Sequence, residues 1–217
     1  MPTLTADLLL FDLDGTLVDS RRNVEAMWRA WCEKEGVDPE RLLAVYEGRQ
    51  GKSVVAELAP HLDPESEDEW IIRYQLEQTG GVDPVAGVHA MINRLSSDGW
   101  AIVTSCTRAL AASRLRAAAL PDPPLLVSAD DISRSKPDPE GFLLASDRCG
   151  VPPRRCVVFE DSVAGLNAAA AAGMAAVNLT AATRDTPDAE LQATDWTEVA
   201  IEANADGTSR WTVTLPA

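Results

Sequence analysis

The sequence predicts an α/β fold, in which helices cover both faces of a parallel β-sheet and a small helical module is inserted near the N-terminus. Two observations support this prediction. After residue 84, short apolar segments typical of buried strands alternate with amphipathic segments typical of helices. By contrast, residues 20–80 contain helix-like segments only. Alternation of the first kind is characteristic of a parallel sheet, and such sheets bind ligands at the carboxyl ends of their strands.

The N-terminal part of the chain begins with one strand and continues with helices. The strand is expected at residues 7–12, because these positions are apolar almost without interruption. In the next segment Val24, Met27, Trp28 and Trp31 recur at helical spacing, and we expect both tryptophans to pack inside the module. Further helices are predicted at residues 40–46, 53–62 and 65–78. A linker that contains glycine and proline is predicted at residues 80–84.

The rest of the chain alternates between strands and helices. The strands are expected at residues 100–104, 125–128, 156–160 and 175–178. The helices are expected at residues 88–97, 108–120, 139–149 and 162–172. Near the C-terminus, Asp206 and Gly207 separate two β-prone runs, which predicts a hairpin over residues 199–215.

Composition and charge exclude several classes of protein. The chain has 217 residues, of which 46% are hydrophobic and 24% charged, as in globular proteins and unlike disordered or collagen-like chains. No apolar run reaches the roughly 18 residues of a membrane span, and residues 1–7 lack the basic start of a signal peptide. The net charge of −15 disfavours nucleic-acid binding. A small anionic ligand can still bind where a few cations or a metal ion lie together.

The cysteines form no metal-binding or disulfide pattern. Cys32, Cys106, Cys149 and Cys156 include no Cys-x-x-Cys pair, and the chain has only two histidines that could join them. We therefore expect four free thiols in a reducing compartment, which favours a cytoplasmic protein.

Polar side chains stand where the predicted strands end. Asp12 and Asp14 end the first strand, Thr104 and Ser105 another, and Glu160 and Asp161 a third, with Lys136 in the loop between the last two. In a parallel sheet these points converge on one edge. Close carboxylates cannot all stay ionised without compensation, and a hard cation such as Mg²⁺, with carboxylate, water and phosphate ligands, provides it.

Each of these groups also has a purely structural interpretation. Taken alone, the paired carboxylates, the Thr-Ser pair and the lysine are typical of helix caps, turns and solvated surface. Their joint occurrence at successive strand ends is not explained by capping, and it favours a site. Gly15 suggests a position that needs positive φ or a close backbone approach.

These residues resemble the four motifs of the haloacid dehalogenase-like superfamily. The matching segments are residues 12–20 (DLDGTLVDS), 103–105 (VTS), 135–139 (SKPDP) and 159–162 (FEDS), the last followed by the glycines at 165 and 173. The resemblance covers about residues 6–180 and is greatest to the β-phosphoglucomutase-like branch, which includes sugar- and polyol-phosphate phosphatases. It implies a Rossmann-like core of residues 1–19 and 83–217, into which a helical cap of residues 20–82 is inserted.

The resemblance also implies a role for each motif residue. Asp12 is expected to attack phosphorus, and Asp14 to protonate the leaving alcohol and then deprotonate water. Mg²⁺ is expected on Asp12, on the Asp14 carbonyl and on Asp161, with Glu160 close by. The phosphate-binding residues are expected to be Gly15, Thr104, Ser105 and Lys136.

The helical cap is expected to select the substrate. Similar caps present a basic or polar loop to the leaving group, and residues 48–53 (GRQGKS) make Arg49 and Lys52 the candidates, with surface charge as the alternative. Tyr46 stands where a phosphate-binding loop of the nucleotide-binding type has its first glycine, and no strand precedes it. Arg108, after the second motif, is a third candidate for specificity.

The function implied is that of a Mg²⁺-dependent phosphatase acting through an aspartyl-phosphate on a small phosphorylated metabolite. One alternative is a phosphohexomutase, disfavoured because residues 21–24 lack the histidine that mutases of this branch place in the cap hinge. Another is a non-catalytic regulatory or binding protein on the same fold. We expect no nucleic-acid or membrane partner, and a monomer or small homo-oligomer.

Overall fold

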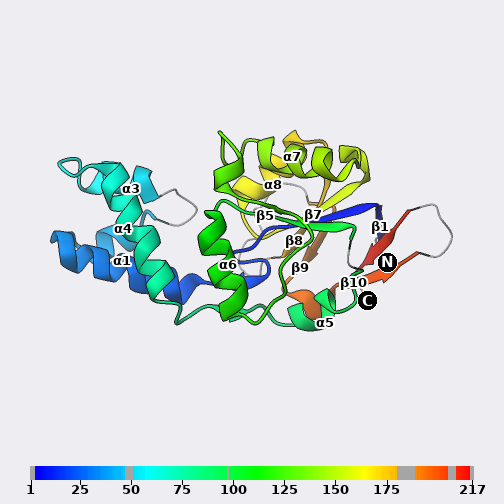
Figure 1. Cartoon of the computed structure of the whole chain (residues 1–217), viewed down its shortest axis with the longest axis horizontal. Helices are drawn as coiled ribbons and strands as arrows, with labels where there is room; N and C mark the ends of the chain where they lie inside the picture. The colour runs from blue at the N-terminus through cyan, green and yellow to red at the C-terminus, as the bar shows by residue number, and fades with distance from the viewer. Residues whose placement is uncertain (1–2, 47–50, 97, 180–188, 205–208, 216–217) are drawn as a thin grey trace. The chain divides into compact units, whose positions relative to one another are not determined.

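The computed structural model describes residues 3–46, 51–96, 98–179, 189–204 and 209–215. The chain divides into two compact units, one formed by Met1–Asp19 with Asp83–Ala217 and the other by Ser20–Val82. The first unit is mixed α/β, and the second is helical (Figure 1). Their assignment as a core domain and a cap domain stays a prediction.

The first unit is built on a six-stranded sheet in which every neighbouring pair of strands is parallel. The predicted fold class, an α/β protein with a Rossmann-like parallel sheet, is therefore confirmed. In spatial order the strands are β6 (Leu126–Val127), β5 (Trp100–Val103), β2 (Leu8–Phe11), β7 (Cys156–Glu160), β8 (Ala175–Leu179) and β9 (Leu191–Ala193).

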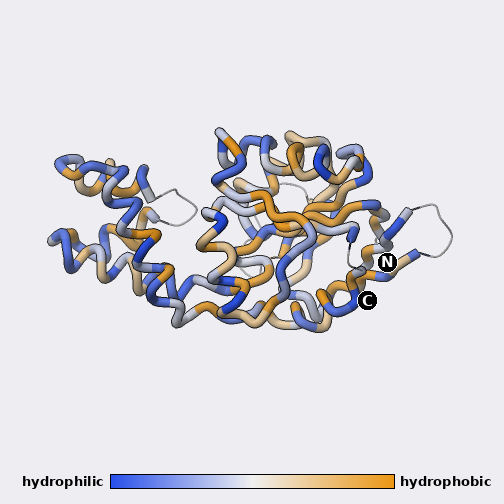
Figure 2. The backbone as a smooth tube through the Cα atoms, viewed as in Figure 1, coloured by the Kyte–Doolittle hydropathy of each residue, from blue (hydrophilic) through white to orange (hydrophobic). Residues whose placement is uncertain are grey.

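Helices lie on both sides of this sheet (Figure 1). On one side are α7 (Glu140–Cys149) and α8 (Val163–Ala171), which pack on alternate residues of β2, Leu8 and Leu10. On the other are α5 (Val88–Ile92) and α6 (Arg108–Ala117). Because both faces are covered, β2, β5 and β7 are buried at every position. Figure 2 shows that much of the tube at the centre of this unit is hydrophobic.

A second, three-stranded antiparallel sheet joins the two ends of the chain. β11 (Trp211–Thr214) lies between β1 (Thr3–Ala6) and β10 (Ala200–Ala203). The predicted pairing of two C-terminal strands is thus confirmed, whereas Asp206 and Gly207 lie outside the described residues. The indole of Trp211 donates a hydrogen bond to the carbonyl of Gly99 at 3.1 Å, which ties this sheet to the start of β5.

Within its described residues the second unit contains four helices, α1 (Arg21–Glu35), α2 (Pro39–Leu43), α3 (Gly51–Leu58) and α4 (Pro64–Glu77). Gly36 caps the C-terminus of α1, and its φ of 69° is the left-handed conformation that glycine adopts readily. Trp28 and Trp31 are buried in the core of this unit, as expected. The Trp31 indole donates to Glu67 Oε2 at 2.8 Å, which gives the buried carboxylate a partner.

The structure differs from the sequence-based expectations at short elements. β3 (Val18–Asp19) pairs with β4 (Asp83–Pro84), where a linker was expected. β9 was not predicted, and α5 ends at Ile92 rather than at residue 97. Periodicity cannot identify pairing over two or three residues, because such segments contain less than two repeats of the pattern. Three single-turn 3₁₀ segments were also not predicted: Ala129–Asp131, Pro153–Arg155 and Trp196–Glu198.

None of the helices within the described residues combines the length and the apolar character that crossing a membrane requires.

The helical layer made by α7 generates a stability prediction. Phe142 is 1% exposed and packs in the core beside Val103 and Val127. Replacing it by alanine should leave a cavity and lower the free energy of unfolding by about 3–5 kcal/mol. The neighbouring Leu143 is 39% exposed, and Leu143→Ala should change it by no more than about 0.5 kcal/mol. Urea denaturation of both variants tests this, and equal losses would contradict the packing described.

Candidate active site

The carboxyl ends of three neighbouring strands bring the predicted site residues together. Asp12 follows β2, Thr104 follows β5, and Glu160 is the last residue of β7. The register aligns Phe11 with Phe159, and the Asp12 amide donates to the Phe159 carbonyl at 3.0 Å. The two carboxylates therefore stand side by side where these central strands end.

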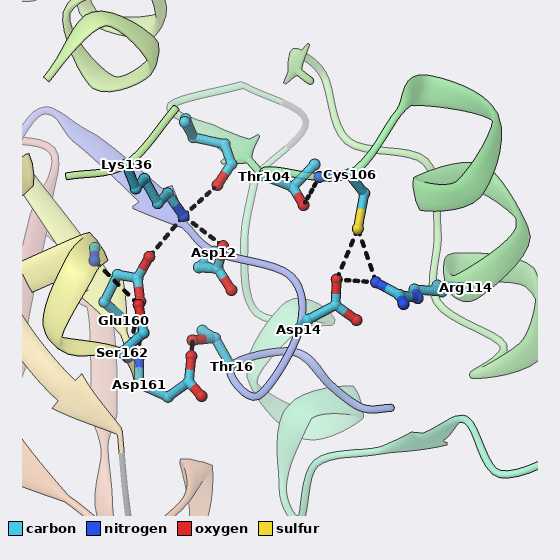
Figure 3. A network of polar contacts seen from close by, with 12 residues as sticks. Asp12, Asp14, Thr16, Thr104, Cys106, Arg114, Lys136, Glu160, Asp161 and Ser162 are labelled. Atoms are coloured by element: carbon cyan, nitrogen blue, oxygen red, sulfur yellow. Dashed lines mark hydrogen bonds and ion pairs between the residues drawn. The ribbon is translucent and has the colours of Figure 1, made fainter. Parts of the chain in front are cut away.

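Lys136 is the cation at the centre of this arrangement (Figure 3). Its Nζ lies 2.5 Å from Asp12 Oδ1, 2.6 Å from Glu160 Oε1 and 3.0 Å from the Val103 carbonyl oxygen. Burial opposes the charged form of Lys136, but the carboxylates of Asp12 and Glu160 outweigh it and raise the pKa of the ammonium group. The lysine is thus a fixed positive charge, which can balance a negative ligand as well as the carboxylates.

Three carboxylates form a group that could hold a metal ion. Asp12, Glu160 and Asp161 each place an oxygen within 4.8 Å of the others. Burial raises the pKa of Asp12 well above its ordinary value, with Lys136 opposing and the neighbouring carboxylates adding to the shift. Burial and the charge of Glu160 raise the pKa of Asp161 to about 7. Crowded oxygen donors that resist ionisation fit a hard divalent cation, which would compensate their charge.

Glu160 is held on both of its oxygens. Oε1 accepts from Lys136, whereas Oε2 accepts from the amides of Asp161 and Ser162, each at 3.0 Å, and from the Ser162 hydroxyl at 2.9 Å. Gly165, in the first turn of α8, is required beside it, because a Cβ there would lie 1.8 Å from Glu160 Oε1. The glycine of the fourth motif therefore lets α8 begin directly against this carboxylate.

Gly15 provides the corresponding close approach in the first motif. Its φ is +90°, and a Cβ at this position would lie 1.9 Å from Asp161 Oδ2. The next residue, Thr16, donates through Oγ1 to Asp161 Oδ1 at 3.4 Å. The loop after β2 thus touches Asp161 directly, and no other residue type fits at position 15 without movement.

Trp196 contacts this loop, and sequence analysis did not identify this residue. Its indole donates to the Thr16 carbonyl at 2.8 Å, and its ring packs against Phe11 and Phe159. Trp196 lies 180 residues from Thr16 along the chain, so no local pattern could indicate the contact. The only signal in the sequence would be the hydrophobic character of Trp196, which favours burial.

Asp14 turns away from the three carboxylates. Its Oδ2 accepts from Arg114 Nη1 and from Cys106 Sγ, the latter at 3.0 Å (Figure 3). Sequence analysis predicted the helix that carries Arg114 but did not single out the residue. One signal was present: Arg114 follows Leu110 by four residues, so a charge stands in the apolar stripe of α6.

Two of the expected phosphate-binding residues, Thr104 and Ser105, line a cavity with Lys136. Thr104 is buried, and its Oγ1 accepts from the Cys106 amide at 3.1 Å, so its hydroxyl hydrogen can be donated elsewhere. Phosphate binding by these residues and by Gly15 stays a prediction.

The candidates for specificity have other partners in this structure. Lys52 Nζ lies 2.5 Å from Glu65 and 3.9 Å from Asp68, both in the helical unit. Arg108 Nη2 donates to Asp131 at 2.6 Å and to the Leu126 carbonyl at 3.2 Å. Arg49 lies outside the described residues. Contact of these side chains with a substrate stays a prediction.

Comparison with known proteins finds similar chains and a similar fold. Hexitol phosphatase A of Escherichia coli (strain K12) is 37% identical over 188 residues, which cover 82% of this chain and 84% of that protein. The 2-deoxyglucose-6-phosphate phosphatase 2 of Saccharomyces cerevisiae is 29% identical, over 83% of this chain and 82% of the relative. The crystal structure of CbbY from Rhodobacter sphaeroides in complex with phosphate has a TM-score of 0.75 at 23% identity, and covers 89% of this chain and 96% of its own.

The family model described as "Haloacid dehalogenase-like hydrolase" matches residues 9–179, a range that includes all four motifs. The sequence resemblance is therefore confirmed, and the chain belongs to the haloacid dehalogenase-like hydrolase family.

Proposed function

We propose that this protein is a Mg²⁺-dependent phosphatase that hydrolyses a small phosphorylated sugar or polyol. The observation that carries the proposal is the contact of Lys136 with Asp12, which is one of a group of three carboxylates. A nucleophile, a fixed cation and a set of hard oxygen donors are the parts that phosphoryl transfer needs. The names of the hexitol and 2-deoxyglucose phosphate phosphatases among its relatives support the substrate class.

In the proposed first step, a carboxylate oxygen of Asp12 attacks phosphorus. The bond between phosphorus and the ester oxygen breaks, and the leaving alkoxide takes a proton from Asp14. Lys136 and the Thr104 hydroxyl stabilise the charge on the transferring oxygens. The product of this step is an alcohol and an aspartyl-phosphate on Asp12.

In the proposed second step, water attacks the same phosphorus and gives a proton to Asp14. The bond to Asp12 breaks, so that inorganic phosphate leaves and both aspartates return to their initial states. Asp12, Asp161, Glu160 and the Asp14 carbonyl would hold the Mg²⁺, which supplies Lewis-acid stabilisation of phosphate charge when bound. The helical unit is proposed as the cap that selects the leaving group.

The nucleophile is tested by phosphate release. We expect the protein with Mg²⁺ to release inorganic phosphate from sorbitol 6-phosphate, 2-deoxyglucose 6-phosphate, glucose 6-phosphate or glycerol 1-phosphate. Asp12→Asn should abolish turnover without unfolding the protein, because an amide oxygen is a far weaker nucleophile than a carboxylate. Asp147→Asn removes an exposed carboxylate of α7 and should leave the rate unchanged.

Other outcomes separate the competing functions. A near-normal rate of phosphate release by the Asp12→Asn variant would contradict the aspartyl-phosphate mechanism. Interconversion of sugar 1- and 6-phosphates without phosphate release would indicate a mutase. Binding of Mg²⁺ without turnover of any of these esters would indicate a non-catalytic protein.

The raised pKa of Asp161 predicts how pH and Mg²⁺ act together. Its pKa of about 7 in the folded protein exceeds the value of about 4 in an unfolded chain. Its contribution to stability is therefore present below about pH 4 and is lost as pH rises towards about 7. Mg²⁺ competes with the proton, so it should raise Tm more at about pH 8 than at about pH 5.

Thermal unfolding in EDTA and in Mg²⁺ checks this expectation. Asp161→Asn should remove most of the Mg²⁺-dependent rise in Tm, whereas Asp147→Asn should keep it. An unchanged rise in Asp161→Asn, or none in the wild type at either pH, would contradict a metal site at Asp161.

A further inference from the structure

Asp14 is held by two donors that belong to none of the predicted roles. Arg114 Nη1 and Cys106 Sγ both contact the same oxygen, Asp14 Oδ2, and Arg114 Nη1 also lies 2.7 Å from Cys106 Sγ. Figure 3 shows the three side chains converging on one point, apart from the contacts of Lys136. Both donors come from the segment that follows β5, Cys106 from its loop and Arg114 from α6.

Arg114 is deeply buried for a charged residue. Its side chain is 6% exposed, compared with 25% for Asp14. A guanidinium is buried at a large desolvation cost unless a carboxylate pairs with it. Arg114 keeps its charge: burial opposes the charged form, but Asp14, Cys106 and Asp12 together outweigh burial and raise the pKa of the guanidinium. This charge is therefore a permanent feature of the site.

Cys106 contributes a neutral donor beside that charge. Burial, and then the nearby Asp14, raise the pKa of the Cys106 thiol, so the sulfur keeps its proton. The thiol donates a hydrogen bond to Asp14 Oδ2, with 3.0 Å between the sulfur and the oxygen. Oδ2 thus accepts from two buried groups, which restricts rotation of the carboxylate.

We propose that Arg114 is a positioning residue for Asp14: together with Cys106 it fixes the orientation of the carboxyl group that transfers the proton in the reaction. This inference rests on the proposed phosphatase function. In the first step the proton of Asp14 passes to the leaving alkoxide as its bond to phosphorus breaks. In the second step a proton of the attacking water passes to Asp14 as the bond between phosphorus and Asp12 breaks.

The dependence on the leaving group distinguishes positioning from packing. A sugar or polyol alkoxide needs a proton to leave, whereas p-nitrophenolate is a stable anion that leaves without one. Arg114→Met should therefore lower kcat/KM for the best alkyl phosphate of the panel above by about 100-fold, the scale of general acid–base catalysis. It should lower kcat/KM for p-nitrophenyl phosphate far less.

The matched control is Arg116→Met, which removes the same charge from an exposed position two residues further along α6. It should leave both kcat/KM values unchanged. Arg114→Lys retains the charge but not the planar fork of donors, and it should restore part of the loss for the alkyl phosphate. If Arg114→Met fails to fold, as judged by circular dichroism, Cys106→Ala removes the other donor and should show the same selectivity for alkyl phosphates.

A double-mutant cycle gives an independent readout. Because Arg114 acts through Asp14, adding Arg114→Met to Asp14→Asn should cause no further loss with the alkyl phosphate. Equal losses for both esters, a faster Arg114→Met variant or additive losses in the double mutant would overturn the inference and leave the phosphatase function intact. Absence of phosphate release from every ester by the wild type would overturn the proposed function, and the inference with it.

Discussion

The contact of Lys136 with Asp12 and Glu160 is the interaction on which the rest of the site depends. Two carboxylates that end adjacent buried strands repel each other and lose hydration, and the ammonium group between them compensates both effects. The raised pKa values of Asp12 and Asp161 indicate that the lysine alone does not balance the group. A divalent cation would compensate this residual negative charge in the proposed reaction.

Close packing of the backbone is the second constraint. Gly15 and Gly165 each stand where a Cβ would overlap a carboxylate, Asp161 in the first case and Glu160 in the second. The Gly15 contact joins the loop after β2 to the turn after β7, whereas the Gly165 contact joins the start of α8 to the last residue of β7. The parallel register brings these segments within touching distance, and the glycines allow the distance to be kept.

A layer of residues outside the motifs fixes the motif loops. Trp196 donates a hydrogen bond to the carbonyl of Thr16, and Arg114 and Cys106 donate hydrogen bonds to Asp14. The aspartates of the first motif are thereby held differently: Asp12 by Lys136, and Asp14 by the buried guanidinium of α6. Two carboxylates that are two residues apart can for this reason be assigned different chemical roles.

The sequence by itself determined the fold class and which strand ends carry polar side chains, because apolar runs and their interruptions are local patterns. Three-dimensional packing decided the rest. The short strand β9 and the pairing of β3 with β4 were missed because they contain too few residues for a pattern. Arg114 and Trp196 were missed because their contacts join residues 100 and 180 positions apart. Only the folded chain brings such pairs together, since burial and charge pairing depend on neighbours in space.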